Sequence, residues 1–598
     1  MRQTTFRTDS GSSEERIIVP LGIVRLIRSG FKRYRIDELL DGFKDAGVPM
    51  SRTIENLCIA ALDESYSMLD WDMLINRSEL RKEFYCGECD IRYWTMDRDL
   101  ERLGAYLEEV VDHLAKVSRV LYPDTPTHVL VDGSHVERNG SKGENVKYGE
   151  GGGSVQLQDQ FMVATNAATG TPIAAELYPG NQNDPQQYKD FIPQLMYLLN
   201  RGSLVIMDNG GSAGEILDEI TRWGNAYITR LRLNPTDEAM IRERKDEMVY
   251  VGMGVACIRE TFESSGRTKY LFFSVDSYAA SLARADKALA DLEAERTRAK
   301  EILTETNDPR NLVRTPKSPF YEVVVDSARI VMTNDPWEEP DLTKEKKEVT
   351  PTKGGWFKLE CPFQMDSRLV LVIYRHRVDI EHAISTLKSV VNLAPMRVWA
   401  KSTTRGKLVL GTIIQFILSA AIYDMKPEIK KRAVDRRTVE VWTKPDPATV
   451  VKELRRYQGI VRAYPWGSHW VDEVRDCGVL DAMVAVLDRY DEKGAIMLPE
   501  SSFKHARMPP QAVRPRKIDK KLAMSILQFF ETEVYPHFMK GRSHWKIGDP
   551  RELAVYSEPP GLDPESDGAP GLRGKRAYYG ENDLFRLYCK MDPPEHLQ

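Results

Sequence analysis

The segment YRHRVDIEHAISTLK, which begins at Tyr374, carries four side chains whose types and spacing suit chemistry on a phosphodiester. The spacing i, i+3, i+7 and i+14 separates Tyr374, Arg377, Glu381 and Lys388. On a helix that turns about 100° per residue, these positions fall within roughly 60° of one another. A carboxylate can hold a metal ion, and a phenol, a guanidinium and an ammonium can hold phosphate oxygens. The pattern therefore predicts a helix face for phosphodiester chemistry, and the alternative is an ordinary solvated charged face.

Two further acids end apolar runs that are typical of strands. The run THVLVDGSH (127–135) ends at Asp132, and the run GSLVIMDNGG (202–211) ends at Asp208 and is followed by turn residues. Chains that alternate strands and helices bind ligands at the carboxyl ends of their strands. Each aspartate by itself could be a loop or N-cap acid. Together with Glu381, the two aspartates predict a site of three carboxylates.

The elements that must position these acids alternate along the chain. Two strands are expected over 160–167 and 171–179, joined by a turn and followed by a helix over 185–199. A helix over 212–224 and a strand over 225–232 follow Asp208. The order is strand, strand, strand, helix, strand, helix, strand, which predicts an α/β fold. One acid closes the first strand, and another closes the strand after the first helix.

With these residues, the chain resembles a DDE transposase of the insertion-sequence type, in the group named for the signature Y-x2-R-x3-E-x6-K. The four residues from Tyr374 to Lys388 match that signature at every spacing. Asp132 and Asp208 match the first and second catalytic acids of the family by context. GNQND at 180–184, DNGG at Asp208 and APMRVW after Lys388 also resemble family patterns. The resemblance covers roughly residues 125–425.

The resemblance implies a fold and a set of roles. The fold would be an RNase H-like mixed sheet with helices on both faces, interrupted by an insertion domain. Asp132, Asp208 and Glu381 would hold two Mg²⁺ ions, with Mn²⁺ as a substitute, and Asp132 would bridge them. Arg377 and Lys388 would bind DNA phosphates, and Tyr374 would donate a hydrogen bond to a phosphate. The attacking group would be water for cutting and a DNA 3′-hydroxyl for joining.

The implied activity is metal-dependent cleavage and strand transfer of an insertion sequence by cut-and-paste transposition. Its partners would be double-stranded DNA, as terminal inverted repeats and target, and a second copy of the chain in a homodimer. Two alternatives stay open. One is a metal-dependent nuclease of the same fold that does not join strands. The other is a decayed copy that only binds DNA, against which the intact acids and signature argue.

The length of 598 residues suggests several domains, because Asp208 and Glu381 are too far apart for a simple connection within one fold. The N-terminal part is expected to be mainly helical and to bind element ends or dimerise, and the C-terminal extension to be rich in helix. The expected boundaries are 1–122 for the N-terminal region, 123–234 and 354–425 for the two parts of the catalytic core, 235–353 for the insertion domain and 426–598 for the extension.

Periodicity predicts particular elements outside the core. Helices are expected over 36–48 and 96–121 in the N-terminal region and over 446–460 and 479–492 in the extension.

The insertion is expected to contain a long polar helix over 278–306, a strand over 321–333 and an exposed loop over 334–353. Trp356 follows them. In relatives that excise through DNA hairpins, a Trp late in the insertion holds a flipped base, so Trp356 could stack on an extruded base. The alternative is a Trp packed in the sheet.

The overall charge of the chain does not indicate DNA binding, since the formal net charge is −5. Charge is nevertheless local, and residues 366–407 carry eight basic residues against three acids. Two further basic runs lie at 426–437 and 25–35. Local patches of this kind are what a DNA footprint requires, although any one of them could be a solvated surface.

The sequence predicts a cytoplasmic, nucleoid-associated protein. MRQTTFRTDSGSSEER at the start has no apolar core of a signal peptide, and the apolar run over 408–423 is short for a membrane span and contains Gln415. That run suits a buried core helix. The seven scattered cysteines fit a reducing compartment. Cys86 and Cys89 lack a convincing second pair for zinc and suit an ordinary loop.

Overall fold

A computed structural model describes most of the chain from residue 15 to residue 498. Within that range the described residues exclude 64–67, 78–89, 124–127, 139–142, 152–153, 253, 262–266, 307–320, 325–328, 333–336, 338–352, 391–397, 399, 429–444, 465–466 and 474–477; beyond it they comprise 525–526, 528–529 and 555–556. The Cys86–Cys89 pair, most of the expected loop over 334–353 and most of the basic run over 426–437 therefore lie outside the described residues.

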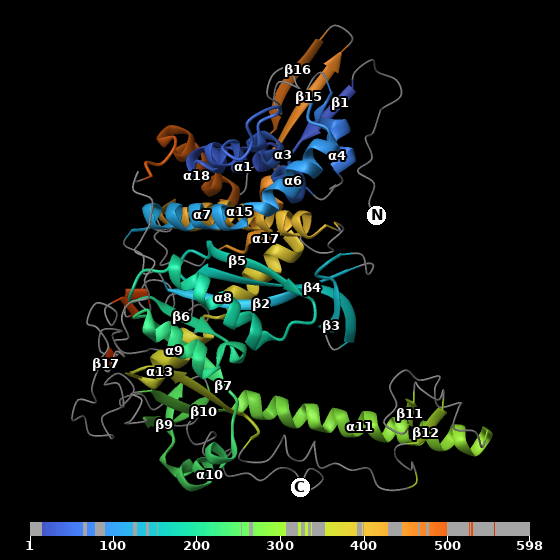
Figure 1. Ribbon diagram of the computed structural model, residues 1–598, viewed down its shortest axis with the longest axis vertical. Helices are drawn as coiled ribbons and strands as arrows, with labels where there is room; N and C mark the ends of the chain where they lie inside the picture. The colour runs from blue at the N-terminus through green and yellow to red at the C-terminus, as the bar shows by residue number, and fades with distance from the viewer. Residues whose placement is uncertain are drawn as a thin grey trace. The chain divides into compact units, whose positions relative to one another are not determined.

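The chain divides into two compact units (Figure 1). Unit 1 combines 1–229 with 369–561, and unit 2 combines 230–368 with 562–598. Unit 1 is thus assembled from two segments that are separated in sequence by unit 2. Asp132, Asp208 and Glu381 all belong to unit 1.

The sheet of unit 1 has the predicted order of elements except for one additional strand after the first, and the first strand continues beyond Asp132 instead of ending there. Along the chain run β2 (Val129–Glu137), β3 (Lys147–Gly151), β4 (Ser154–Asn166), β5 (Pro172–Pro179), α8 (Asp184–Leu198), β6 (Leu204–Met207), α9 (Gly214–Arg222) and β7 (Ala226–Leu231). Strand β4 pairs antiparallel with β2, β3 and β5, while β2 pairs parallel with β6, and β6 parallel with β7. The fold is α/β and RNase H-like, as predicted.

The apolar strand residues explain why this sheet is covered on both faces. Val129, Leu130 and Val131 are each 1% exposed or less, and all four residues of β6 are buried. Successive side chains of a strand point to opposite faces. Val131 packs in the cluster that contains Phe191 of α8, whereas its neighbour Asp132 pairs with Arg377 at the start of α14 (Val378–Ser385). Helices therefore lie on both faces, and continuous apolar strands are expected there.

A layer of helices completes unit 1 and is built from both ends of the chain. The N-terminal members are α1 (Leu21–Arg33), α2 (Ile36–Asp41), α3 (Met50–Leu62), α4 (Met68–Ile75), α6 (Tyr93–Ala105) and α7 (Leu107–Leu121); the later members are α15 (Lys401–Asp424), α17 (Pro447–Arg456) and α18 (Gly478–Lys493). Helix α1 packs against α17 and α18 (Figure 1). Arg25 of α1 bonds to Asp488 and Asp491 of α18. A three-stranded sheet also joins the N-terminal region to the extension. In it, β1 (Glu15–Val19) pairs with β15 (Gln458–Tyr464), which pairs with β16 (Gly467–Glu473).

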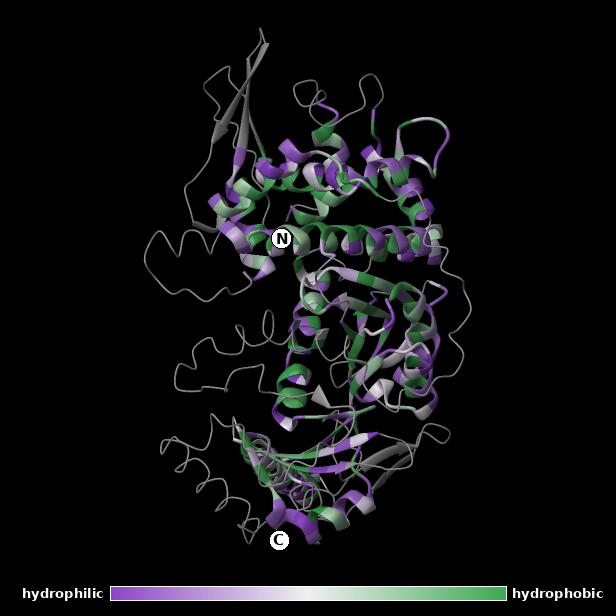
Figure 2. Cartoon of the chain, turned by 90° about the vertical axis from the view of Figure 1, so that its left-hand side faces the viewer, coloured by the Kyte–Doolittle hydropathy of each residue, from purple (hydrophilic) through white to green (hydrophobic). Residues whose placement is uncertain are grey.

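Helix α15 is the buried helix expected over 408–423. By length and composition it is the one helix in the described part of the chain that could cross a membrane, and 89% of its most apolar window is buried within the protein. Figure 2 shows hydrophobic residues running along the long helices of this layer. Helices α6 and α15 cross at Gly104 and Gly406, where a Cβ on either glycine would lie 1.8 Å from a carbonyl oxygen of the other helix. The two backbones therefore touch at this crossing.

Several helices differ in extent from their predictions. The helix expected over 36–48 ends at Asp41 and is followed by Gly42, and Gly47 has a φ of +87° that suits glycine. The helix expected over 96–121 divides into α6 and α7 at Tyr106, whose φ and ψ of −106° and 28° are not helical. In the extension, α17 ends at Arg456 and the chain enters β15, while α18 confirms the helix expected over 479–492.

Unit 2 contains an antiparallel sheet and a long helix. Its sheet comprises β8 (Val249–Gly252), β9 (Val255–Thr261), β10 (Thr268–Ser274) and β13 (Trp356–Cys361). Helix α10 (Pro235–Arg244) precedes the sheet, and α11 (Val275–Thr306) confirms the long helix expected over 278–306. The single strand expected over 321–333 is two strands, β11 (Tyr321–Val324) and β12 (Arg329–Met332), paired antiparallel.

Candidate active site

The signature segment forms three helical pieces and not the single regular helix that its spacing predicts. They are α13 (Ser367–Arg375), α14 and the π-helical turn η5 (Thr386–Val390). At the junction of the first two, Arg377 N–H donates to the Tyr374 carbonyl, and Ile380 N–H donates to the Arg377 carbonyl, both at 3.0 Å. These i→i+3 bonds tighten the chain, and the π-helical turn widens it again. The angular positions expected on a regular helix therefore do not hold across the whole signature.

The register of two parallel strands places Asp132 and Asp208 at the same edge of the sheet. Val131 of β2 is opposite Met207 of β6. Each aspartate is the next residue along its strand direction, and both are partly buried at the point where the apolar run ends. The adjacency that the sequence predicts for these two acids is present.

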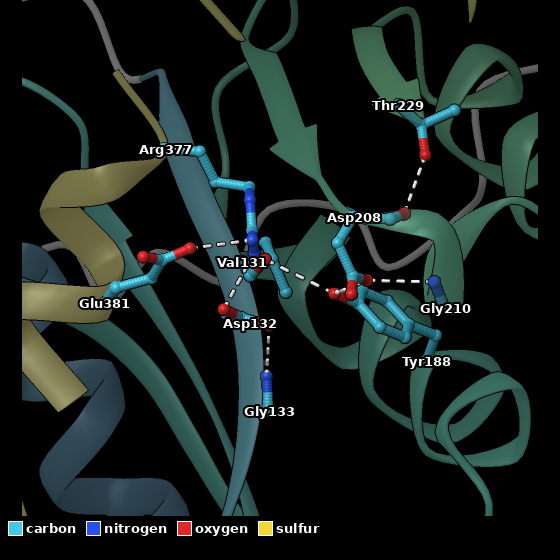
Figure 3. A network of polar contacts seen from close by, with 9 residues as sticks. All are labelled: Val131, Asp132, Gly133, Tyr188, Asp208, Gly210, Thr229, Arg377 and Glu381. Carbon is cyan, nitrogen blue, oxygen red and sulfur yellow. Dashed lines mark hydrogen bonds and ion pairs between the residues drawn. The ribbon is translucent and has the colours of Figure 1, made fainter. Parts of the chain in front are cut away.

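Arg377 joins the first acid to the third (Figure 3). Its Nη1 lies 2.8 Å from Asp132 Oδ2, and its Nη2 lies 2.8 Å from Glu381 Oε1. Glu381 is one turn further along the helical segment, so an i,i+4 pair holds its carboxylate toward the guanidinium. The Glu381 side chain is 52% exposed, whereas that of Asp132 is 16% exposed. The structure thus brings together residues 132, 377 and 381, which are distant in sequence.

Asp208 is held by a different set of donors. The Gly210 N–H donates to its Oδ1 at 2.8 Å, and the Tyr188 hydroxyl lies 3.0 Å from the same oxygen. The Thr229 hydroxyl donates to the Asp208 main-chain carbonyl at 2.8 Å. Sequence reasoning missed Tyr188 and Thr229. The only feature of the sequence that could have pointed to Tyr188 is its place, as an aromatic residue with a hydroxyl, on the predicted helix that precedes the strand before Asp208.

The pKa of Asp132 reflects its burial and its charged neighbours. Burial raises the pKa of Asp132 to about 6, with Asp208 and Glu381 adding to the rise and Arg377 opposing it. Burial and the charge of Asp208 also raise the pKa of Asp184, a fourth acid at the start of α8. Ionising these carboxylates together is therefore unfavourable without a nearby cation.

The donors fit a hard divalent cation in their chemistry. Carboxylate oxygens are the ligands that Mg²⁺ prefers. Among the described residues, however, no three His, Cys, Asp or Glu side chains are gathered closely enough to hold an ion. The guanidinium of Arg377 lies between Asp132 and Glu381, so an ion shared by these two acids must compete with it.

Comparison with protein families decides the identity of this domain. The family described as transposase DDE domain matches residues 123–416, about half of the chain, and the match includes all three acids. The chain belongs to this family. Among solved structures, the cryo-EM structure of a piggyBac transposase synaptic complex with hairpin DNA is similar at 9% identity and a TM-score of 0.33, covering 73% of this chain and 79% of that chain. No curated protein matches the chain.

The remaining signature residues of this transposase lie around Arg377 and further along. Tyr374 is close enough to Arg377 for its phenol to interact electrostatically with the guanidinium. Lys388, in the π-helical turn, is half-buried; burial lowers its pKa, and Glu137 at the end of β2 opposes that change. Lys388 thus faces the end of β2 beyond Asp132.

Trp356 belongs to unit 2, where it begins β13. Its side chain is 7% exposed, and its ring lies 5.3 Å from that of Phe273 in the apolar cluster of this unit. This position corresponds to the alternative of a Trp packed in a sheet.

Several residues of the expected basic runs are paired with acids of the transposase itself. In the run over 25–35, ion pairs join Arg28 to Glu55 and Arg35 to Glu38, besides the Arg25 pairs with α18. In residues 366–407, they join Arg368 to Asp366 and Arg405 to Glu176. The positive potential of these runs is therefore smaller than their sequence suggests.

Proposed function

We propose that this transposase cleaves DNA at the ends of an insertion sequence and transfers the strands by cut-and-paste transposition. The observation that carries the proposal is the convergence of three acids from distant segments on one edge of an RNase H-like sheet. Asp132 lies within β2 and Asp208 directly follows the neighbouring parallel strand β6, and Glu381 shares Arg377 with Asp132. Magnesium ions, or manganese as a substitute, are the proposed cofactors.

Each acid has a role that follows from its surroundings. Asp132, Asp208 and Glu381 would hold two divalent ions, which when bound would activate the attacking oxygen and stabilise the leaving one. Asp208 is oriented by the Gly210 N–H, so its carboxylate has a fixed direction before any ion binds. Arg377, Lys388 and Tyr374 would contact DNA phosphates, as members of the Y-x2-R-x3-E-x6-K group, to which we assign the chain.

The proposed partners are double-stranded DNA and a second copy of the chain. The DNA would be the terminal inverted repeats of the element and a target duplex, bound by a homodimer associated with the nucleoid. The five expected domains, from the N-terminal end-binding or dimerisation region to the extension over 426–598, remain part of this proposal. The proposal also includes stacking of Trp356 on a flipped base. The alternative for this residue is packing in the sheet, and the burial of the Trp356 ring favours that alternative.

The test of catalysis replaces each acid in turn. Asp132→Ala, Asp208→Ala and Glu381→Ala are each expected to abolish nicking of labelled end DNA in magnesium while gel shifts show end binding largely retained. Glu215→Ala, an exposed acid of α9 that pairs with Lys189, is the matched control and is expected to nick normally. Near-normal nicking by any one of the three variants would remove that acid from the site.

Strand joining separates the proposal from a nuclease of the same fold. Precleaved ends taken from inverted repeats that flank the gene are incubated with a target plasmid and magnesium. Joined products that disappear in Asp132→Ala support a transposase that joins strands. Cleavage without any joined product would assign the chain to the nuclease alternative, and binding without cleavage would assign it to a decayed copy.

A further inference from the structure

The hydroxyl of Tyr188 lies between the two strands that carry the aspartates (Figure 3). It is 3.0 Å from Asp208 Oδ1 and 3.3 Å from the carbonyl oxygen of Val131, the residue before Asp132. The side chain is only 2% exposed. One buried phenol on α8 thus contacts the carboxylate that follows β6 and the backbone of β2 immediately before the first acid.

The loop after Asp208 is shaped to receive this ring. A Cβ built on Gly210 would lie 2.7 Å from Tyr188 Cε2, and one built on Gly211 would lie 3.0 Å from Cδ1. Side chains at these positions would therefore push the ring away from the carboxylate. The two glycines of the DNGG sequence make room for Tyr188, which gives that motif a local physical reason.

The phenol has one proton and two acceptors in reach. A charged acceptor forms the stronger and shorter hydrogen bond, so the proton goes to Asp208 Oδ1. The Gly210 N–H donates to the same oxygen. Among the described residues, both donors recorded for this carboxylate act on Oδ1, which leaves Oδ2 as the oxygen that faces other ligands.

We propose that Tyr188 is a positioning residue that fixes the rotamer of Asp208 and its placement relative to Asp132. The inference rests on the proposed function, because positioning matters only if both aspartates hold the same ions. Partners that orient a metal-binding carboxylate commonly change metal affinity or activity by about 10- to 100-fold when they are removed. Tyr188 would thus act through Asp208 and not on the DNA.

The test removes the hydroxyl and keeps the ring. Mn²⁺ affinity is measured by titration of the DNA-free protein, followed by electron paramagnetic resonance, for wild type and Tyr188→Phe. About tenfold weaker binding is expected, with a similar rise in the Mn²⁺ concentration that half-saturates nicking. Tyr178→Phe is the matched control: it removes another buried hydroxyl, on β5, for which the described residues provide no hydrogen-bond partner. Its Mn²⁺ affinity should stay at the wild-type value.

A second variant approaches the same contact from the other side. Gly210→Ala keeps the phenol and displaces its ring, so it should weaken Mn²⁺ binding in the same direction as Tyr188→Phe. Unchanged Mn²⁺ affinity in Tyr188→Phe, beside a wild type that binds Mn²⁺ and nicks DNA, would overturn this inference alone. Equal weakening by Tyr178→Phe would also overturn it, since the effect would then be a general loss of packing. A wild type that neither binds Mn²⁺ nor nicks would overturn the proposed function and this inference together.

Discussion

Arg377 provides the positive charge that the cluster of acids needs before any ion is bound. Its two nitrogens lie 2.8 Å from Asp132 and from Glu381, and its side chain is 20% exposed. A guanidinium in this place pairs with both acids and keeps them oriented. It also occupies the space between two of the acids that would hold an ion.

Replacing Arg377 should therefore change metal binding in a defined direction. Arg377→Ala removes a competing cation, and we expect Mn²⁺ to bind the DNA-free protein roughly tenfold more tightly, equivalent to about 1.4 kcal/mol. Affinity for end DNA should fall, with a smaller dependence on salt, because one phosphate contact contributes about 0.9 to the logarithmic slope. Calorimetric titration with Mn²⁺ measures the first effect, and gel shifts over a salt series measure the second.

Arg222→Ala is the control for loss of one surface charge, since Arg222 pairs only locally with Glu219 among the described contacts. Weaker Mn²⁺ binding in Arg377→Ala would mean that the guanidinium assembles the acids and does not compete for them.

A second prediction at the scale of residues concerns His128, which precedes β2. The Leu204 N–H donates to its Nδ1 at 2.9 Å, and its Nε2 lies 3.0 Å from Ser525 Oγ. Burial lowers the pKa of His128 to about 4, and its contact with Ser525 opposes that change. The folded protein binds this proton less readily than the unfolded chain. Its stabilising contribution is therefore complete above a pH of about 6.5, the ordinary pKa of histidine, and declines as the pH falls toward about 4.

The loss from His128 should reach about 3 kcal/mol in the free energy of unfolding at a pH of about 4. His128→Gln, which cannot gain the proton, should lose less stability on acidification, so the two proteins should converge as the pH falls. Thermal melting over a series of buffers from neutral pH down to about 4.5 checks this. Parallel curves for the two proteins would show that other groups control the acid sensitivity.

At the scale of elements, the crossing of α6 and α15 is the tightest contact between helices in the described core. A Cβ at Gly406 would lie 1.8 Å from the Leu100 carbonyl oxygen, a distance that no rotamer change relieves. Gly406→Ala must push the helices apart and should lower the free energy of unfolding by about 3 kcal/mol or more. Denaturant unfolding measures the change.

Gly214→Ala is the matched control, because nothing lies within 4 Å of the place that a Cβ on this residue of α9 would take. Alanine favours a helix over glycine by up to about 1 kcal/mol, so this variant should be neutral or slightly more stable. A neutral Gly406→Ala would mean that the two helices can separate without loss of packing.

The sequence predicts the strands near the two aspartates better than it predicts the signature helix, and the difference has a physical reason. The segments that directly precede Asp132 and Asp208 are continuous apolar runs, and burial on both faces leaves them few alternatives. The signature helix is different, because its junction depends on tertiary contacts. His376, which is 7% exposed, donates to the Ala167 carbonyl in the turn after β4. The periodicity of a segment cannot reveal such a bond, and the spacing of the signature residues does not report that the helix tightens at Arg377.

In the site, too, some features can be predicted from the sequence and others depend on the fold. The adjacency of Asp132 and Asp208 could be predicted because both follow apolar runs that are visible in the sequence, and Glu381 is singled out by its spacing from Tyr374, Arg377 and Lys388. Tyr188 could not, because a tyrosine on an amphipathic helix is usually a packing residue, and its contact with Asp208 depends on the fold and on the room left by Gly210.

At the scale of the whole molecule, the N-terminal helices and the described helices of the extension stabilise each other in unit 1. Arg25 and Ser29 of α1 bond to Asp491 of α18, and the Tyr34 hydroxyl donates to that of Tyr490 at 2.9 Å. A chain that ends at residue 428 lacks α17 and α18 and exposes the apolar face of α1. It should melt at a markedly lower temperature, or aggregate, compared with a chain that ends at residue 530.

Differential scanning fluorimetry of the two truncated proteins compares them directly, and the longer one is the control because it retains α17 and α18. Equal melting temperatures would show that the N-terminal helices are stable without the extension.

The division of unit 1 into two segments has a consequence for synthesis of the protein. The strands that carry Asp132 and Asp208 leave the ribosome before residues 230–368, and Glu381 leaves after them. At about 5–20 residues per second, the ribosome needs roughly seven to thirty seconds to add that segment. During this interval the nascent chain holds two of the three acids and lacks the helix that completes the set. A chain released during this interval by a nonsense codon or by stalled translation would therefore contain Asp132 and Asp208 without Glu381. Under the proposed function, such a fragment would lack one of the acids that DNA cleavage requires.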